Sequence, residues 1–110
     1  MERRLSVRKN LYVTVKLTVG GKSYSAFIED VSMEGVGLTI LLASEEMVAG
    51  IVVGTILELK FHTETSDEIT LQCVIKRVDT TLEKKIGIIY FIGVEVIDPP
   101  IEYNMFVSTL

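Results

Sequence analysis

The sequence predicts an all-β fold, a six-stranded antiparallel β-barrel with a short C-terminal helix. Residues 12–19 alternate apolar and polar side chains without a break, as a half-buried strand does. Gly20-Gly21 follows at once and is typical of a two-residue hairpin turn. Further strand-like runs joined by short connections bring the number to six, which favours a closed or nearly closed barrel. The 110 residues fit one domain.

The first hairpin has a predictable register, because pairing is counted outward from the Gly-Gly turn. The expected cross-strand pairs are Leu17 with Tyr24, Val15 with Ala26, and Val13 with Ile28. All of these side chains fall on the apolar face, so the register is consistent with one buried side of the hairpin. We expect the second strand to end at Asp30.

The later elements follow from the same alternation. Strands are expected over residues 36–42, 55–62, 69–78 and 86–97, with a polar connection at 79–85. The inward side chains are expected to be the even positions of the third strand and Leu57, Leu59 and Phe61 of the fourth. Residues 43–53 are ambiguous and allow one helical turn. Pro99-Pro100 ends the last strand and is compatible with a helix over residues 101–110.

Charge is distributed unevenly along the chain. The formal net charge is −4, yet residues 1–10 carry four basic side chains and one acidic side chain. The remaining acidic body is expected to repel a nucleic-acid polymer, whereas a basic segment on such a body suits a small, doubly charged phosphate ligand. Residues 1–10 also lack apolar periodicity. We therefore expect a flexible basic arm over residues 1–10 and the barrel domain over residues 11–110.

One connection between strands carries polar groups with binding potential, Asp30-Val31-Ser32-Met33-Glu34-Gly35. Asp and Ser side chains bond local backbone groups and hold turns, and Gly35 permits a positive φ or the close approach of another group. Taken alone, the stretch fits an ordinary Asx-type turn equally well.

The arm offers the complementary chemistry. Arginine guanidinium groups present planar forks that fit phosphate oxygens and the O6/N7 edge of guanine. A carboxylate accepts from the N–H groups on the opposite guanine edge. Arginines on the arm and the Asp30 turn would together form a guanine-phosphate clamp. The alternative for the arm is a solvated basic tail.

These two motifs together resemble the PilZ family, the bacterial receptors for cyclic di-GMP (c-di-GMP). The family pattern is Arg-x-x-x-Arg, followed about two strands later by Asp/Asn-x-Ser-x-x-Gly. Here the two parts are Arg4-Leu-Ser-Val-Arg8 and Asp30-Val-Ser-Met-Glu-Gly35. Tyr90-Phe-Ile-Gly-Val-Glu-Val-Ile97 resembles the last long strand of the family, with Val96 in place of the usual Phe.

The resemblance covers essentially the whole chain, and one pair of positions departs from it. Leu5 and Ser6 stand where the family often has another Arg and an aromatic residue. That difference removes a phosphate contact and a stacking or packing group.

The resemblance implies a split six-stranded barrel and a non-enzymatic c-di-GMP receptor in a bacterial cytoplasm. It implies that the ligand folds the arm onto the barrel and that an unidentified effector protein senses the change. The ligand-binding residues that it implies are Arg3, Arg4, Arg8, Asp30, Ser32 and Gly35. In this family, an Arg at the position of Arg3 accompanies two stacked c-di-GMP molecules; the alternative is that Arg3 points to water. The sequence leaves homodimer formation open.

No catalytic or metal site is expected. His62 is the only His, and it lies on the polar face of a predicted strand without a Cys nearby. Nothing in the pattern places Ser32 or Cys73 beside it as a nucleophile. The single Cys73 is expected in the core, and the lack of a disulfide framework and of a signal peptide favours the cytoplasm.

Two further groups of charges are expected to have no special role. Ser44-Glu45-Glu46 interrupts the apolar stretch over residues 36–57, which argues against a membrane span. Lys76-Arg77 and Lys84-Lys85 are interpreted as surface charge.

Two other functions remain as alternatives. One is a nucleotide-independent module of the same fold that only binds proteins, although such members usually lack the arginines or the Asp-x-Ser turn, and both are present here. The other is a small barrel that binds single-stranded nucleic acid, which would need exposed aromatic side chains in a basic groove.

Overall fold

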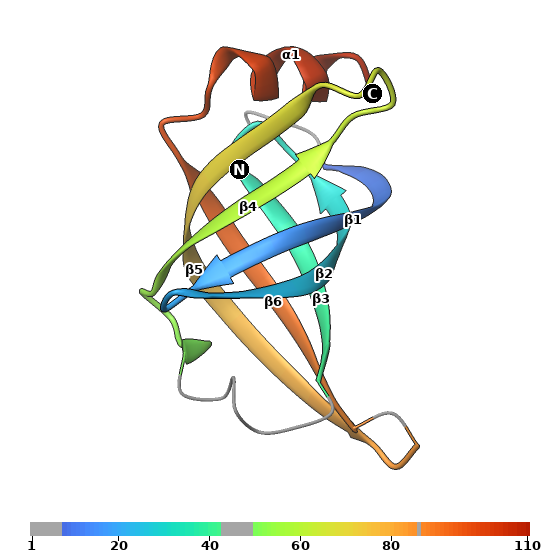
Figure 1. Cartoon of the computed structure of the whole chain (residues 1–110), viewed down its shortest axis with the longest axis vertical. Coiled ribbons are helices and arrows are strands. Elements are labelled where there is room, and N and C mark those ends of the chain that lie inside the picture. Colours follow the sequence, from blue (N-terminus) through green and yellow to red (C-terminus); the bar gives the residue numbers. More distant parts are fainter. Residues whose placement is uncertain (1–7, 43–49, 86) are drawn as a thin grey trace, which may run out of the picture.

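The structure, a computed structural model, describes residues 8–42, 50–85 and 87–110 and shows a closed barrel with a helix at one end (Figure 1). The elements are β1 (Lys9–Val19), β2 (Lys22–Val31), β3 (Gly35–Leu42), β4 (Ile56–His62), β5 (Glu68–Glu83), β6 (Gly87–Ile97) and α1 (Ile101–Ser108). Around the barrel the order is β1-β2-β3-β6-β5-β4, and every neighbouring pair is antiparallel. The predicted fold class is confirmed.

The predicted register of the first hairpin is confirmed as well. The pairs are Leu17 with Tyr24, Val15 with Ala26, and Val13 with Ile28. Gly20 and Gly21 have φ angles of 60° and 81°, the left-handed conformation that a two-residue turn requires. Strand β2 runs one residue beyond the predicted end, to Val31, and β1 begins at Lys9, within the range expected for the arm.

The core fills the inside of the barrel with the side chains that alternation predicted. The inward set includes Val36, Leu38, Ile40, Leu57, Leu59 and Phe61, all buried. Cys73 is also fully buried among them, as expected of a small core side chain. Aliphatic side chains from all six strands thus pack together inside the barrel and hold the strands that carry surface residues.

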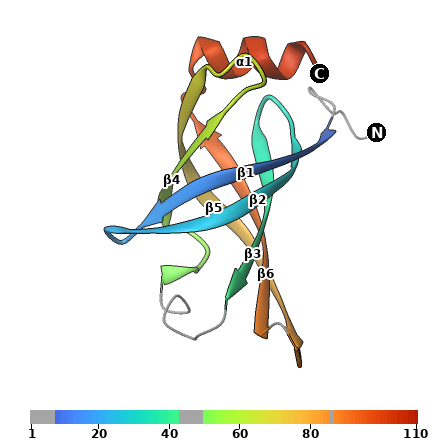
Figure 2. The ribbon, with the colours of Figure 1, turned by 45° about the vertical axis from the view of Figure 1, so that its right-hand side comes forward.

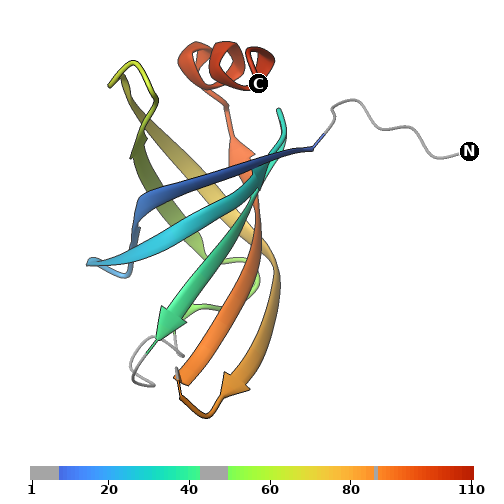
Figure 3. The same cartoon turned by 90° about the vertical axis from the view of Figure 1, so that its right-hand side faces the viewer.

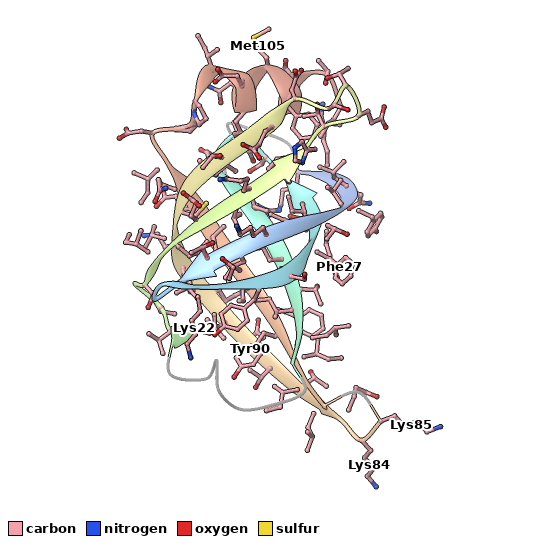
Figure 4. All side chains as sticks on the ribbon, viewed as in Figure 1. Lys22, Phe27, Lys84, Lys85, Tyr90 and Met105 are labelled. Carbon is pink, nitrogen blue, oxygen red and sulfur yellow. The ribbon has the colours of Figure 1, made fainter. Side chains whose placement is uncertain are left out.

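The predicted polar connection at residues 79–85 is wrong, because β5 continues to Glu83. Its last residues pair with β6 up to Glu83 opposite Gly87, and the hairpin projects beyond the barrel (Figure 1). Side chains from Asp79 to Glu83 are all exposed, so this part of the strand has no buried face and no alternation. Lys84 and Lys85 lie at its tip, pointing to solvent (Figure 4). The connection expected over residues 43–53 falls largely on residues 43–49, outside the described residues.

Helix α1 follows Pro100 and covers one end of the barrel (Figure 3), which confirms the predicted helix. It buries Tyr103 and Val107, and the rings of Phe106 and Phe61 lie 5.7 Å apart between centroids. Met105 points away from the barrel (Figure 4).

The start of β1 and the end of α1 lie side by side (Figure 2). There Lys9 Nζ donates a hydrogen bond to the backbone oxygen of Leu110. Among the described residues, no helix has the length and apolar character needed to cross a membrane.

Candidate functional site

The turn between β2 and β3 is held by Ser32. Its N–H donates to the Gly35 carbonyl at 2.9 Å, and its Oγ accepts from the N–H groups of Gly35 at 3.2 Å and Glu34 at 3.3 Å. The Ser32 side chain is buried, so these bonds are shielded from water. The local turn is therefore made by the serine, and the Asp30 carboxylate is directed elsewhere.

Asp30 of β2 binds Arg8, the residue that immediately precedes the neighbouring strand β1. Arg8 Nε donates to Asp30 Oδ1 at 2.8 Å, and Nη2 of the same guanidinium donates to the same oxygen. Both side chains are partly exposed, at 41% for Arg8 and 32% for Asp30, so the pair lies at the protein surface. The structure thus brings the two predicted motifs into direct contact, although Arg8 and Asp30 are 22 residues apart.

Two glycines leave room around this site, Gly37 for the Asp30 carboxylate and Gly35 for strand β6. A Cβ at Gly37 would lie 2.8 Å from Asp30 Oδ1 and 3.0 Å from Oδ2, so a side chain there would displace the carboxylate. A Cβ at Gly35 would lie 2.7 Å from the Val94 carbonyl oxygen of β6. Gly35 therefore allows another group to approach closely, which is one of the two uses predicted for it. Sequence reasoning missed Gly37, and the repeated glycine in Gly35-Val36-Gly37 was the available signal.

Tyr103 of helix α1 fastens the turn from inside the protein. Its hydroxyl donates to the Ser32 carbonyl at 2.6 Å and lies 3.4 Å from the Gly35 carbonyl. The side chain is fully buried, and burial, with smaller contributions from Cys73 and Asp30, raises the pKa of Tyr103 well above its ordinary value. The hydroxyl consequently remains a hydrogen-bond donor throughout the physiological range. No motif in the sequence pointed to this residue.

An open pocket of about 330 Å³ lies beside the turn. It is lined by Arg8, Ser32, Glu34, Gly35, Lys76, Val94 and Glu95. Arg8, Ser32 and Gly35 were predicted site residues, and Asp30 adjoins them through Arg8. Arg3 and Arg4 lie outside the described residues. Lys76 of β5 and Glu95 of β6 were not predicted as site residues. The pocket thus combines residues of β3, β5 and β6 with the β2–β3 turn and with Arg8, which precedes β1.

The family comparison agrees with this arrangement of motifs. The model of the PilZ domain matches residues 2–105. The chain belongs to the PilZ domain family. This PilZ domain thus carries the Arg-x-x-x-Arg and Asp-x-Ser-x-x-Gly motifs on a barrel that places Arg8 against Asp30. No curated protein matches the chain significantly.

Solved structures share the fold at low sequence identity. The Bacillus subtilis inhibitor of motility (MotI/DgrA) has a TM-score of 0.75 and 14% identity, covering 99% of this chain and 50% of its own. The c-di-GMP complex of MrkH from K. pneumonia has values of 0.69 and 18%, with 99% and 51% coverage. The PilZ domain of YcgR from Escherichia coli with c-di-GMP has 0.74 and 9%, with 97% and 87% coverage. The chain therefore spans about half the length of the first two.

Proposed function

We propose that this PilZ domain is a non-enzymatic receptor for c-di-GMP. The observation that carries the proposal is the Arg8–Asp30 pair at the edge of an open pocket, beside a turn held by Ser32. The family membership supports it, as do the c-di-GMP complexes of two proteins with this fold, MrkH and YcgR.

Arg8 and Asp30 can each bind a different part of a guanine nucleotide. The Arg8 guanidinium donates to phosphate oxygens or to the O6/N7 edge of guanine, and the Asp30 carboxylate accepts from the N–H groups of the Watson–Crick edge. Ser32 holds the turn in the shape that presents Asp30, and Gly35 keeps the turn close to β6. Arg3 and Arg4 supply further guanidinium groups to the same ligand.

Ligand binding is proposed to act on the arm over residues 1–10. Bridging Arg4 and Arg8 through phosphate would order the part of this segment that precedes β1 against the barrel, at a backbone entropy cost of roughly 1–2 kcal/mol per residue. An effector protein in the cytoplasm would then recognise the rearranged arm. Hydrogen exchange tests this: c-di-GMP should slow exchange in the arm, and equal protection with and without ligand would contradict it.

Titration calorimetry with c-di-GMP, GTP and a short oligonucleotide tests the binding proposal. We expect c-di-GMP alone to bind, and Arg8→Ala and Asp30→Ala each to lose most of the affinity while the barrel stays folded. Arg77 and Asp79 form a matched exposed pair with Nε and Oδ2 3.4 Å apart, outside the pocket lining. Arg77→Ala and Asp79→Ala should bind like the wild type.

Two outcomes would contradict this function. A folded wild-type protein that does not bind c-di-GMP would favour the alternative, a nucleotide-independent PilZ-fold interaction module. Full affinity in Arg8→Ala or Asp30→Ala would show that the ligand binds elsewhere.

A further inference from the structure

A β-bulge in β5 directs two consecutive basic side chains to the outside of the barrel. The pairing of β5 with β6 shifts between Ile75 and Arg77, which leaves Lys76 without a partner residue in the ladder. Ile75 is buried, whereas both Lys76 and Arg77 are exposed. Regular alternation would have turned one of the two basic side chains inward. The bulge therefore adds a cation to the outer surface at a defined place.

Lys76 and Arg77 form ion pairs with different carboxylates in different places. Lys76 Nζ lies 3.4 Å from Glu95 Oε1, and both residues line the pocket that contains Arg8 and Gly35. Glu95 of β6 pairs with Gly35 of β3, so Glu95 lies beside the turn that Ser32 holds. Arg77 instead pairs with Asp79 farther along β5, and neither lines the pocket. Of the two neighbouring cations, only Lys76 belongs to the candidate site.

We propose that Lys76 is a phosphate-binding residue of this pocket and that Glu95 holds it in the ligand-free state. This inference rests on the proposed binding of c-di-GMP. With Arg8 also on the pocket lining, a phosphate that enters the pocket meets two cations. Lys76 and Glu95 are more than half exposed, so their ion pair is weak and a dianionic ligand can displace the carboxylate.

Glu95 has the opposite effect on an anionic ligand. Its negative charge on the pocket wall repels phosphate, and its pairing with Lys76 occupies the cation that the ligand needs. Removing the Glu95 charge should therefore strengthen binding, whereas removing the Lys76 charge should weaken it. A purely structural role for the pair would predict that both changes act in the same direction.

Four single-charge substitutions test the inference, with c-di-GMP titrated by calorimetry. Lys76→Gln should weaken binding about tenfold, the size expected for one lost charge-assisted contact. Glu95→Gln should tighten it by roughly threefold. Arg77→Gln changes the net charge as Lys76→Gln does, and Asp79→Asn changes it as Glu95→Gln does. Both of these control variants should bind like the wild type. Lys76→Arg should keep most of the affinity, because it keeps a cation at the bulge.

Salt provides a readout that packing does not affect. Raising the ionic strength should weaken wild-type binding more than binding by Lys76→Gln, since that variant has one fewer charge contact to screen. Thermal unfolding should be nearly unchanged in all of these variants, because the side chains are exposed.

The outcomes separate this inference from the proposed function. If the wild type binds c-di-GMP and Asp30→Ala abolishes binding, but Lys76→Gln behaves like Arg77→Gln, then Lys76 is not a ligand contact. Weaker binding by Glu95→Gln would overturn the assigned role of Glu95. A wild type that fails to bind c-di-GMP would overturn both proposals together.

Discussion

The hydroxyl of Tyr103 offers a one-atom test of how helix α1 supports the site. Tyr103→Phe keeps the buried ring and removes only the donor to the Ser32 carbonyl, which lies 2.6 Å away. A buried acceptor that loses its partner costs about 1–3 kcal/mol of unfolding free energy. For a domain of this size, that corresponds to a decrease in Tm of roughly 4–12 °C.

Urea and thermal unfolding measure this cost, with Tyr12→Phe as the control. Tyr12 is 79% exposed on β1, so the loss of its hydroxyl should change the unfolding free energy by less than about 0.5 kcal/mol. Amide exchange at Glu34 and Gly35 should also accelerate in Tyr103→Phe, because both N–H groups donate to Ser32 Oγ within the fastened turn.

The affinity for c-di-GMP should fall in Tyr103→Phe in proportion to the fraction of molecules with a well-formed turn. Stability equal to that of Tyr12→Phe, together with unchanged exchange at the turn, would refute the positioning role of Tyr103.

Three further predictions concern the core, alkaline pH and stoichiometry. Leu59→Ala should lower the unfolding free energy by roughly 2–5 kcal/mol in urea denaturation, because it opens a cavity at a fully buried position; a smaller loss would indicate a collapsible core. Burial raises the pKa of the Cys73 thiol to about 12 from 9.0, so the folded state holds this proton more tightly than the unfolded state. The stability that the Cys73 thiol contributes should be fully present below pH 9. It should then decline towards pH 12 by at most about 1.4 kcal/mol of unfolding free energy per pH unit, and Cys73→Ala should flatten this decline. Calorimetry should give two c-di-GMP molecules per chain for the wild type and a value nearer one for Arg3→Leu; a ratio of one in both would contradict the two-ligand hypothesis.

The barrel was predictable because its determinants are local. The register of the first hairpin depends only on the Gly20-Gly21 turn and on a period of two, and both can be seen within a few residues of sequence. The end of β5 was missed for a related reason. From Asp79 to Glu83 both faces of the strand are exposed, so the alternation that identifies a strand is absent even though the ladder continues.

The candidate site was predictable only in part, because several of its contacts are non-local. The motifs identified Arg8, Asp30, Ser32 and Gly35, yet they did not show that Arg8 and Asp30 bind each other. The hydrogen bond from Tyr103 joins residues 71 positions apart and depends on where α1 docks. Lys76 enters the pocket only through a register shift between two strands, which one strand's own sequence does not reveal.

The carboxylates around the pocket separate specific recognition from general electrostatics. Asp30 and Glu95 each pair with a cation that lines the pocket, so removing either one makes the site more positive. If c-di-GMP were attracted by charge alone, Asp30→Ala and Glu95→Ala would both tighten binding. The proposed roles predict opposite effects, because in them Asp30 would accept hydrogen bonds from guanine whereas Glu95 would only compete with phosphate. We therefore expect calorimetry to show most affinity lost in Asp30→Ala and affinity gained in Glu95→Ala. Tighter binding in both variants would mean that the pocket attracts an anion without recognising its base.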